Sequence, residues 1–249
     1  MKITPAVWEK RNLGVSCIEV TLGNEDDIYV IDQALAQIDA EYLVIKIPCN
    51  RTDLLFQLQT RGFTVVEVLS TCYHDGQLAS LSRVQQKILE SLSCTRASPH
   101  DLETIYSELK NGMFTTDRVA VDPKFGIESA GRRYAGWLSD GLERGSHVYR
   151  LTHKNLHVGF FVMEPRTPHE WHATLGGVFP QYQRSGFGYF MNYLEVTTAV
   201  AQGAKRIFTS FSSNNPAISA IHFVLGYRLI QQQYILIRHL SYRQSLEFK

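Results

Sequence analysis

A glycine-rich turn between a predicted strand and a predicted helix carries the clearest chemical signal in the sequence. An apolar, β-branched stretch ends at Phe179, and Pro180 prevents it from continuing as a paired strand. A helix is predicted over 187–201, and Gly186 and Gly188 lie at its start. Glycines let the backbone approach a ligand closely, and consecutive N–H groups at a helix N-terminus bind anions. The turn therefore predicts a pyrophosphate site, with a ligand-free turn as the alternative.

Two other phosphate-binding motifs are excluded. No Gly-Lys-Ser/Thr follows the glycines, as a P-loop requires. The next predicted strand ends in Ser212, Ser213 and Asn214, so the acidic residue of a dinucleotide fingerprint is missing.

Two segments resemble the GNAT superfamily of N-acetyltransferases. The pattern Gln-x-x-Gly-x-Gly from Gln183 to Gly188 is similar to the coenzyme A motif of that family, and Asn215 to Tyr227 is similar to a later helix. The resemblance covers about 86–240, and the predicted order of strands and helices agrees with it. It implies an α/β fold with a mixed, mostly antiparallel sheet flanked by helices. It also implies acetyl-CoA as acetyl donor, without a metal.

The resemblance further implies which residues bind the coenzyme. Backbone groups of Gly177, Val178 and Phe179 would pair with the pantetheine arm, and Asn215 would bond to it. Asn215 is also a natural helix N-cap, and both roles are compatible. The pyrophosphate would lie on the turn formed by Gln183, Arg184, Ser185, Gly186, Phe187 and Gly188.

The expected proton donor departs from the family. Four residues before the helix-ending Gly226, where the family commonly has a tyrosine that protonates the leaving thiolate, this sequence has His222. An imidazolium can donate that proton, and the alternative is a histidine that only packs in the helix. Tyr227 stands where the family usually has phenylalanine, and its hydroxyl is a second catalytic candidate.

Upstream residues resemble a narrower group, the bacterial TDP-fucosamine acetyltransferases. The matching residues are Phe114, Arg118, Asp122 and Phe125, Gly131 to Trp137, Glu143 to Gly145, and 42–67. The resemblance implies that the acceptor is the amino group of a nucleotide-linked (TDP) amino-deoxy sugar used for cell-surface polysaccharide, including lipopolysaccharide.

This narrower resemblance implies that Arg118, Asp122 and Tyr134 bind the substrate. Asp122 and Glu128 are candidates for the base that deprotonates the amine. The alternatives for function are transfer to another small amine or to a protein amine, or a non-catalytic coenzyme A-binding module.

The elements that position these residues fall into two parts, separated by the polar segment 74–82. Residues 1–78 are predicted to form a small α/β domain, a diverged partial copy of the second part. Residues 86–249 are predicted to form the acetyl-CoA-binding domain, in the order β-α-α-β-β-β-α-β-α-β-β. This order includes a strand over 88–96 and two strands over 227–240.

Composition narrows the remaining possibilities. Of 249 residues, 44% are apolar and 20% charged, with a net charge of +1, which excludes a disordered chain and disfavours nucleic-acid binding. No apolar run reaches the roughly 18 residues of a membrane span, so a cytoplasmic protein with no membrane partner is predicted. Four separate cysteines predict free thiols. Spacing favours no metal site at His157, His169 and His172, and a monomer and a homodimer both remain open.

Overall fold

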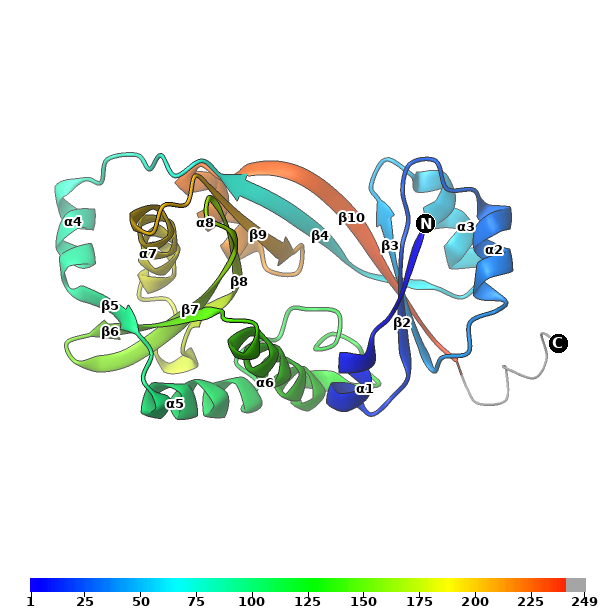
Figure 1. The fold of residues 1–249 in the computed structure, drawn as a ribbon, viewed down its shortest axis with the longest axis horizontal. Coiled ribbons are helices and arrows are strands. Elements are labelled where there is room, and N and C mark those ends of the chain that lie inside the picture. The colour runs from blue at the N-terminus through cyan, green and yellow to red at the C-terminus, as the bar shows by residue number, and fades with distance from the viewer. Residues whose placement is uncertain (241–249) are drawn as a thin grey trace.

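Ten strands form one continuous sheet in the computed structural model, which describes residues 1–240 (Figure 1). The strands are β1 (Lys2–Pro5), β2 (Cys17–Thr21), β3 (Tyr42–Pro48), β4 (Thr64–His74), β5 (Leu92–Arg96), β6 (His147–His153), β7 (Leu156–Thr167), β8 (Glu170–Val178), β9 (Arg206–Ser212) and β10 (Arg228–His239). The helices are α1 (Val7–Leu13), α2 (Ile28–Leu35), α3 (Thr52–Thr60), α4 (Arg83–Glu90), α5 (Pro99–Lys110), α6 (Gly126–Glu143), α7 (Phe187–Ala201) and α8 (Pro216–Leu225).

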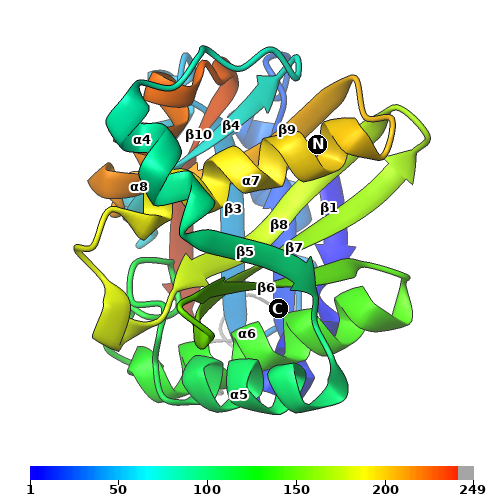
Figure 2. The ribbon, with the colours of Figure 1, turned by 90° about the vertical axis from the view of Figure 1, so that its left-hand side faces the viewer.

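The strand order is β1-β2-β3-β10-β4-β9-β8-β7-β6-β5. Only the pairs β2/β3 and β8/β9 are parallel, and the other described pairs are antiparallel. The predicted fold class, a mixed and mostly antiparallel sheet flanked by helices, is therefore confirmed. Helices α7 and α8 lie on one side of strands β5 to β9, and α5 and α6 lie on the other (Figures 1 and 2).

The two long strands β4 and β10 cross the middle of the molecule and extend into both of its ends (Figure 1). Apart from α1, which lies between β1 and β2, the series β1-β2-α2-β3-α3-β4 has the same order of elements as β7-β8-α7-β9-α8-β10. In the sheet, β10 lies between β3 and β4, while β4 lies between β9 and β10. Each series therefore receives one strand from the other, and the sheet runs across the predicted boundary near residues 78–86. The division into two domains stays a prediction.

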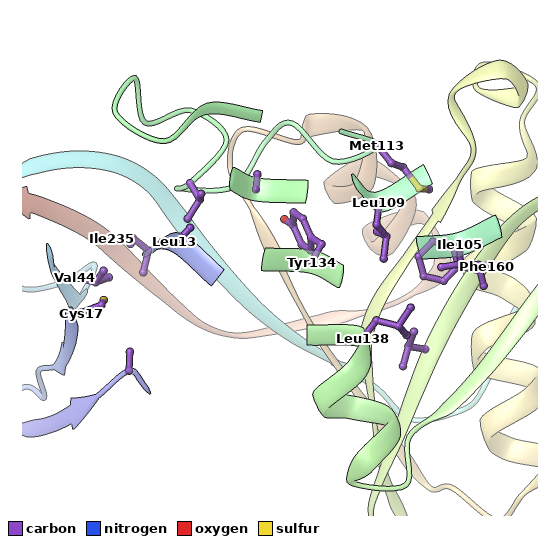
Figure 3. Close-up of a cluster of buried hydrophobic side chains, with 14 of the residues drawn as sticks. Leu13, Cys17, Val44, Ile105, Leu109, Met113, Tyr134, Leu138, Phe160 and Ile235 are labelled. Atoms are coloured by element: carbon purple, nitrogen blue, oxygen red, sulfur yellow. The ribbon is translucent and has the colours of Figure 1, made fainter. Parts of the chain in front are cut away.

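A buried cluster joins the N-terminal elements to α5 and α6. Figure 3 shows it extending from Leu13 and Val44 to Tyr134, Ile105 and Phe160. These side chains are at most 9% exposed, so they fix the position of α6 relative to β2 and β3. Two further clusters lie between the sheet and α7 with α8, and between β2, β3 and α2 with α3.

Helix ends follow the capping signals in the sequence. Ser98 caps α5 in a capping box, with Pro99 at the first helical position. The predicted bounds 187–201 and 216–225 match α7 and α8. The four cysteines are free thiols, as predicted.

Two sequence-based predictions of secondary structure were wrong, and two elements were missed. Residues 83–90 form helix α4, capped by Ser82, so the strand predicted from residue 88 begins only at Leu92. Residues 227–240 form one strand instead of two, because no turn interrupts the pairing of β10 with β3 and β4. Strand β1 and helix α1 were not predicted.

Candidate functional site

The parallel strands β8 and β9 pair for only four residues and then separate. Their pairing runs from Glu170 with Arg206 to Ala173 with Thr209. Directly after Ala173, β8 contains one extra residue, Thr174, relative to β7. Such a bulge bends its strand and ends local pairing. The backbone groups that β8 directs toward β9 beyond Ala173 are therefore available to an extended ligand.

A cavity of about 710 Å³ lies where the two strands part. Its lining includes Phe208 and Ser210, which share one face of β9, and Thr209 and Phe211, which share the other. The cavity therefore reaches both faces of the sheet. Its α7/α8 branch is lined by Gly176, Met191, Asn192, Glu195, Ile218 and His222. Its α6 branch is lined by Glu67, Thr116, Asp117, Arg133, Tyr134 and Trp137, together with Trp8, Glu19 and Lys46 from the N-terminal elements.

The glycine turn lies at the surface, before α7. Gly186 has φ +83° and Arg184 has φ +64°, and residues 183–186 are exposed. A non-glycine residue in the left-handed region is uncommon, and it turns successive backbone N–H groups toward one side. A Cβ on Gly186 would meet nothing within 4 Å, so the space beside the turn is open. The turn is outside the cavity lining.

Of the residues expected to bind a pantetheine arm, some line the cavity and others do not. Asn215 caps α8 by accepting a hydrogen bond from the Ile218 N–H at 3.2 Å, and it lines the cavity. Gly177, Val178 and Phe179 lie at the end of β8 but not in the lining. At Gly177 a Cβ would lie 2.5 Å from the end of the Met113 side chain and 2.9 Å from the Phe114 ring, so a larger residue would require these side chains to shift.

His222 lines the cavity as a neutral ring. Its Nδ1 lies 3.0 Å from the Ile218 carbonyl oxygen, an acceptor, so Nδ1 carries the proton. The ring stacks on Phe211, and its buried Nε2 has no partner among residues 1–240. Burial lowers the pKa of His222 to about 4, against a smaller opposing effect of the hydrogen bond to Ile218. In this neutral form Nε2 could accept a hydrogen bond but has no proton to donate. The role of His222 as proton donor stays a prediction.

Tyr227 lies behind His222, outside the cavity lining. The two rings meet edge to face, with centroids 4.6 Å apart. The tyrosine is 3% exposed, and its hydroxyl has no partner in the described part of the chain. Burial raises its pKa well above 10, so the hydroxyl keeps its proton.

The expected substrate ligand Arg118 belongs to a buried ionic network. Its guanidinium donates to Glu9 at 2.8 Å and to Glu19 at 2.6 Å. Arg133 of α6 donates to the same Glu9 at 2.7 Å and to Asp117 at 2.7 Å. The carboxylates hold Arg118 charged, raising its pKa against the effect of burial. Although Arg118 lines the cavity, its ion pairs connect N-terminal elements to the segment before α6.

The other two expected substrate residues differ in position. Tyr134 is buried beside Phe114 and lines the α6 branch. Asp122 is 2% exposed, lies 2.6 Å from the Nε2 of His239, and does not line the cavity. Glu128, a candidate base, is an exposed residue paired with Arg132. Neither carboxylate reaches the cavity.

Two buried carboxyl groups in the cavity were missed by the sequence analysis. Glu67 of β4 is 7% exposed, and burial raises its pKa, partly offset by the nearby Ser212 hydroxyl and by the charge of Arg118. Glu195 of α7 is 4% exposed, and burial alone raises its pKa to about 8. Each occupies an inward position of an otherwise apolar pattern, a detectable signal. Their placement on opposite branches of one cavity required the fold.

Neither a metal site nor a membrane-spanning helix is present in the described part of the chain. In residues 1–240 no group of histidine, cysteine, aspartate or glutamate side chains is arranged to hold a metal ion. No helix in this range is both long and apolar enough to span a membrane.

Comparison with solved structures identifies the fold. A conserved protein of unknown function from Staphylococcus epidermidis aligns with a TM-score of 0.58 at 13% identity, over 91% of this chain and 85% of that one. A GCN5-related N-acetyltransferase from Kribbella flavida aligns with a TM-score of 0.55 at 13% identity, over 91% and 82%. The chain has the GNAT fold. A tandem GNAT protein from the clavulanic acid biosynthesis pathway aligns with a TM-score of 0.55 at 11% identity, over 90% of this chain and 75% of that one. No protein-family model and no curated protein matches the GNAT-fold chain described here.

Proposed function

We propose that the protein transfers the acetyl group of acetyl-CoA to an amine. The observation that carries this proposal is the cavity at the separation of β8 and β9, which opens to both faces of the sheet. The donor would enter by the α7/α8 branch, with its pyrophosphate on the exposed turn at Gly186 and its pantetheine arm along unpaired backbone of β8. The acceptor would enter by the α6 branch, so the amine and the thioester would meet between the strands.

Glu67 is the proposed general base. Its carboxylate lines the α6 branch, and burial strengthens it as a base by raising its pKa. The amine nitrogen attacks the thioester carbonyl and loses one proton to Glu67, and the C–S bond then breaks as the thiolate takes up one proton. Direct attack forms no covalent intermediate with the protein, so none of the cysteines needs a role.

Measurement of free thiol tests this function. Wild-type protein, acetyl-CoA and an amine acceptor should release coenzyme A in proportion to acetylated product. Binding of acetyl-CoA without thiol release, across sugar amines, polyamines, amino acids and peptides, would instead favour the non-catalytic binding module.

The turn at Gly186 gives a prediction for donor binding. Gly186→Val should weaken acetyl-CoA binding about tenfold or more, because φ +83° costs a β-branched residue roughly 1–2 kcal/mol and the N–H groups would turn away. Calorimetric titration measures the affinity. Gly14→Val is the matched control, because Gly14 has φ +79° and equally open surroundings but lies after α1. An equal loss of affinity in both variants would remove the pyrophosphate assignment.

His222 gives a second prediction. Since its neutral Nε2 can only accept, we propose that it receives a hydrogen bond from a pantetheine amide. His222→Phe should raise the KM for acetyl-CoA roughly five- to tenfold, the scale of one hydrogen bond, while kcat changes less than about threefold. The phenylalanine ring preserves the stacking on Phe211. Steady-state kinetics decide the question, and a hundredfold loss of kcat would restore His222 as the proton donor.

A nucleotide-linked amino-deoxy sugar is the proposed acceptor. Glu164 pairs with both Arg144 and Arg166, at 3.1 Å and 3.0 Å, so one carboxylate faces two guanidinium groups at this part of the cavity. Both arginines are about half exposed, and the extra positive charge suits a diphosphate. The resemblance of residues 114–145 to TDP-fucosamine acetyltransferases supports the same class. A panel of amino sugars, each with and without its nucleotide, tests this choice. Equal kcat/KM for both forms would contradict it.

The N-terminal residues are proposed to be a reduced second GNAT unit that helps to form the acceptor site. The shared order of elements supports this, as do Trp8, Glu19 and Lys46, which reach the α6 branch. In this unit β2 and β3 stay paired from Cys17 with Tyr42 to Thr21 with Lys46. No separation like that of β8 and β9 opens along these residues.

A further inference from the structure

Glu195 is a carboxyl group buried in the cavity wall without a counter-charge. It lies in the middle of α7 and lines the α7/α8 branch of the cavity, which His222 also lines. Among residues 1–240, no cation lies within ion-pair distance of it and no group donates a hydrogen bond to it. A Cβ built on Gly176 would lie 3.0 Å from the Glu195 Oε1, so the carboxyl packs directly against the freed part of β8.

No positively charged group near Glu195 would neutralise its carboxylate. The titratable groups that interact with Glu195 are Tyr227 before β10 and Cys94 on β5. Cys72 on β4 interacts with Tyr227, and His222 on α8 lines the same cavity as Glu195. Burial raises the pKa of both thiols and of Tyr227, and it keeps His222 neutral, so all four are uncharged near neutral pH. Charging Glu195 is therefore disfavoured, and its pKa of about 8 means that it holds a proton at pH 7.

The position along α7 matches the reach of the donor. Glu195 follows Gly186 by nine residues, which is about 13 Å along a helix. An extended pantetheine arm covers a comparable length from its phosphate to its sulfur. A donor with its pyrophosphate at the N-terminus of α7 would thus bring its sulfur close to Glu195, near the point where β8 and β9 part.

We propose that Glu195 is the acid that protonates the leaving thiolate of coenzyme A. This inference rests on the proposed acetyl transfer. As the C–S bond breaks, its electron pair stays on sulfur, and the sulfur takes the proton of the Glu195 carboxyl. One proton leaves the amine for Glu67 and one leaves Glu195 for sulfur, so protons balance within the turnover. Solvent then takes the proton from Glu67 and returns one to Glu195.

The structure favours Glu195 over the two residues expected from the sequence. His222 has no proton on the free nitrogen at neutral pH, and Tyr227 lies outside the cavity lining. Glu195 is the residue of these three that combines a proton at pH 7 with a place in the lining.

The kinetic test compares Glu195→Gln with the wild type. Glutamine keeps the shape and the neutral state but cannot release a proton, so kcat should fall about a hundredfold, while the KM for acetyl-CoA changes less than threefold. Wild-type kcat should decline above about pH 8 as Glu195 loses its proton, and this decline should be missing in the variant. Glu103→Gln, which changes an exposed carboxyl on α5, is the control and should match the wild type in rate and pH profile.

A thermal measurement tests the protonation without activity. A carboxyl whose pKa is raised on folding stabilises the protein below its unfolded pKa, near 4.5, and this stability is lost as the pH rises through about 8. Glu195→Gln lacks that loss, so its Tm should exceed the wild-type Tm by a margin that grows between pH 5 and 8 and then levels off.

The outcomes separate this inference from the proposed function. Thiol release by the wild type together with an unchanged kcat and alkaline decline in Glu195→Gln overturns the role of Glu195 alone. A Tm margin independent of pH also overturns it. Absence of thiol release by the wild type with every acceptor overturns both proposals.

Discussion

Glu67→Gln should lower kcat by a hundredfold or more, the usual scale for a positioned general base. The substitution keeps the size of a 7% exposed side chain but removes its ability to accept the amine proton. Affinity for acetyl-CoA should change little, because Glu67 lies on the α6 branch and the donor would occupy the other. The pH profile adds a second signature. Wild-type kcat should fall on the acid side as Glu67 becomes protonated, at a pH above the ordinary range of a glutamate, because burial raises its pKa.

Stopped or continuous thiol assays from pH 5 to 8 measure both effects. Glu103→Gln changes an exposed carboxyl on α5 and provides the control. If Glu67→Gln keeps more than a third of the wild-type kcat, the proton is accepted elsewhere, and Asp117 on the same branch becomes the next candidate.

Arg118→Met should destabilise the protein by about 3 kcal/mol, since removing one partner from a buried ion pair leaves uncompensated charge. Glu9 would retain Arg133, and Glu19 would retain Lys46, which places the expected loss toward the lower end of the usual range. Urea unfolding measures the change in the free energy of unfolding. Arg132→Met is the matched control: its guanidinium pairs with the exposed Glu128, so the loss should stay below about 1 kcal/mol.

The double variant Arg118→Met/Glu19→Gln separates a structural role from a ligand role. Removing the Glu19 carboxylate, which would keep only Lys46 as its partner, should recover part of the lost stability. If Arg118→Met has an unchanged urea midpoint and a raised KM for the acceptor, Arg118 instead has the substrate-binding role that the sequence suggested.

Local signals predicted the elements around the donor site well. The starts of α7 and α8 were predicted correctly because Gly186 and Asn215-Pro216 favour the beginning of a helix by their own backbone chemistry. Strand β10 runs without a break through the polar residues Gln231 to Gln233, of which Gln231 and Gln232 are exposed and Gln233 is half-buried. Those residues pair with β4 and β3, partners about 160 to 190 residues earlier, which no local pattern reveals.

The candidate site was harder to predict because the protonation states of its residues depend on the side chains packed around them. His222 was found by position, but its neutral state depends on packing against Phe211 and Tyr227. Glu195 repeats at intervals of four with the buried Met191 and Ala199, so a carboxyl on the apolar face of α7 could have been noticed. Whether the Glu195 carboxyl has an arginine as ion-pair partner depends on the tertiary structure.

The exchange of β4 and β10 between the two series also constrains the order in which the chain can fold. Strand β3 finds its inner neighbour only when Gln233 to His239 reach Tyr42 to Pro48. During synthesis one edge of β3 therefore stays unpaired until nearly all of the described chain has left the ribosome. Pairings of such large sequence separation slow folding, and an unpaired edge invites association with other chains. The nascent chain thus faces its greatest risk of aggregation late, just before β10 closes the sheet.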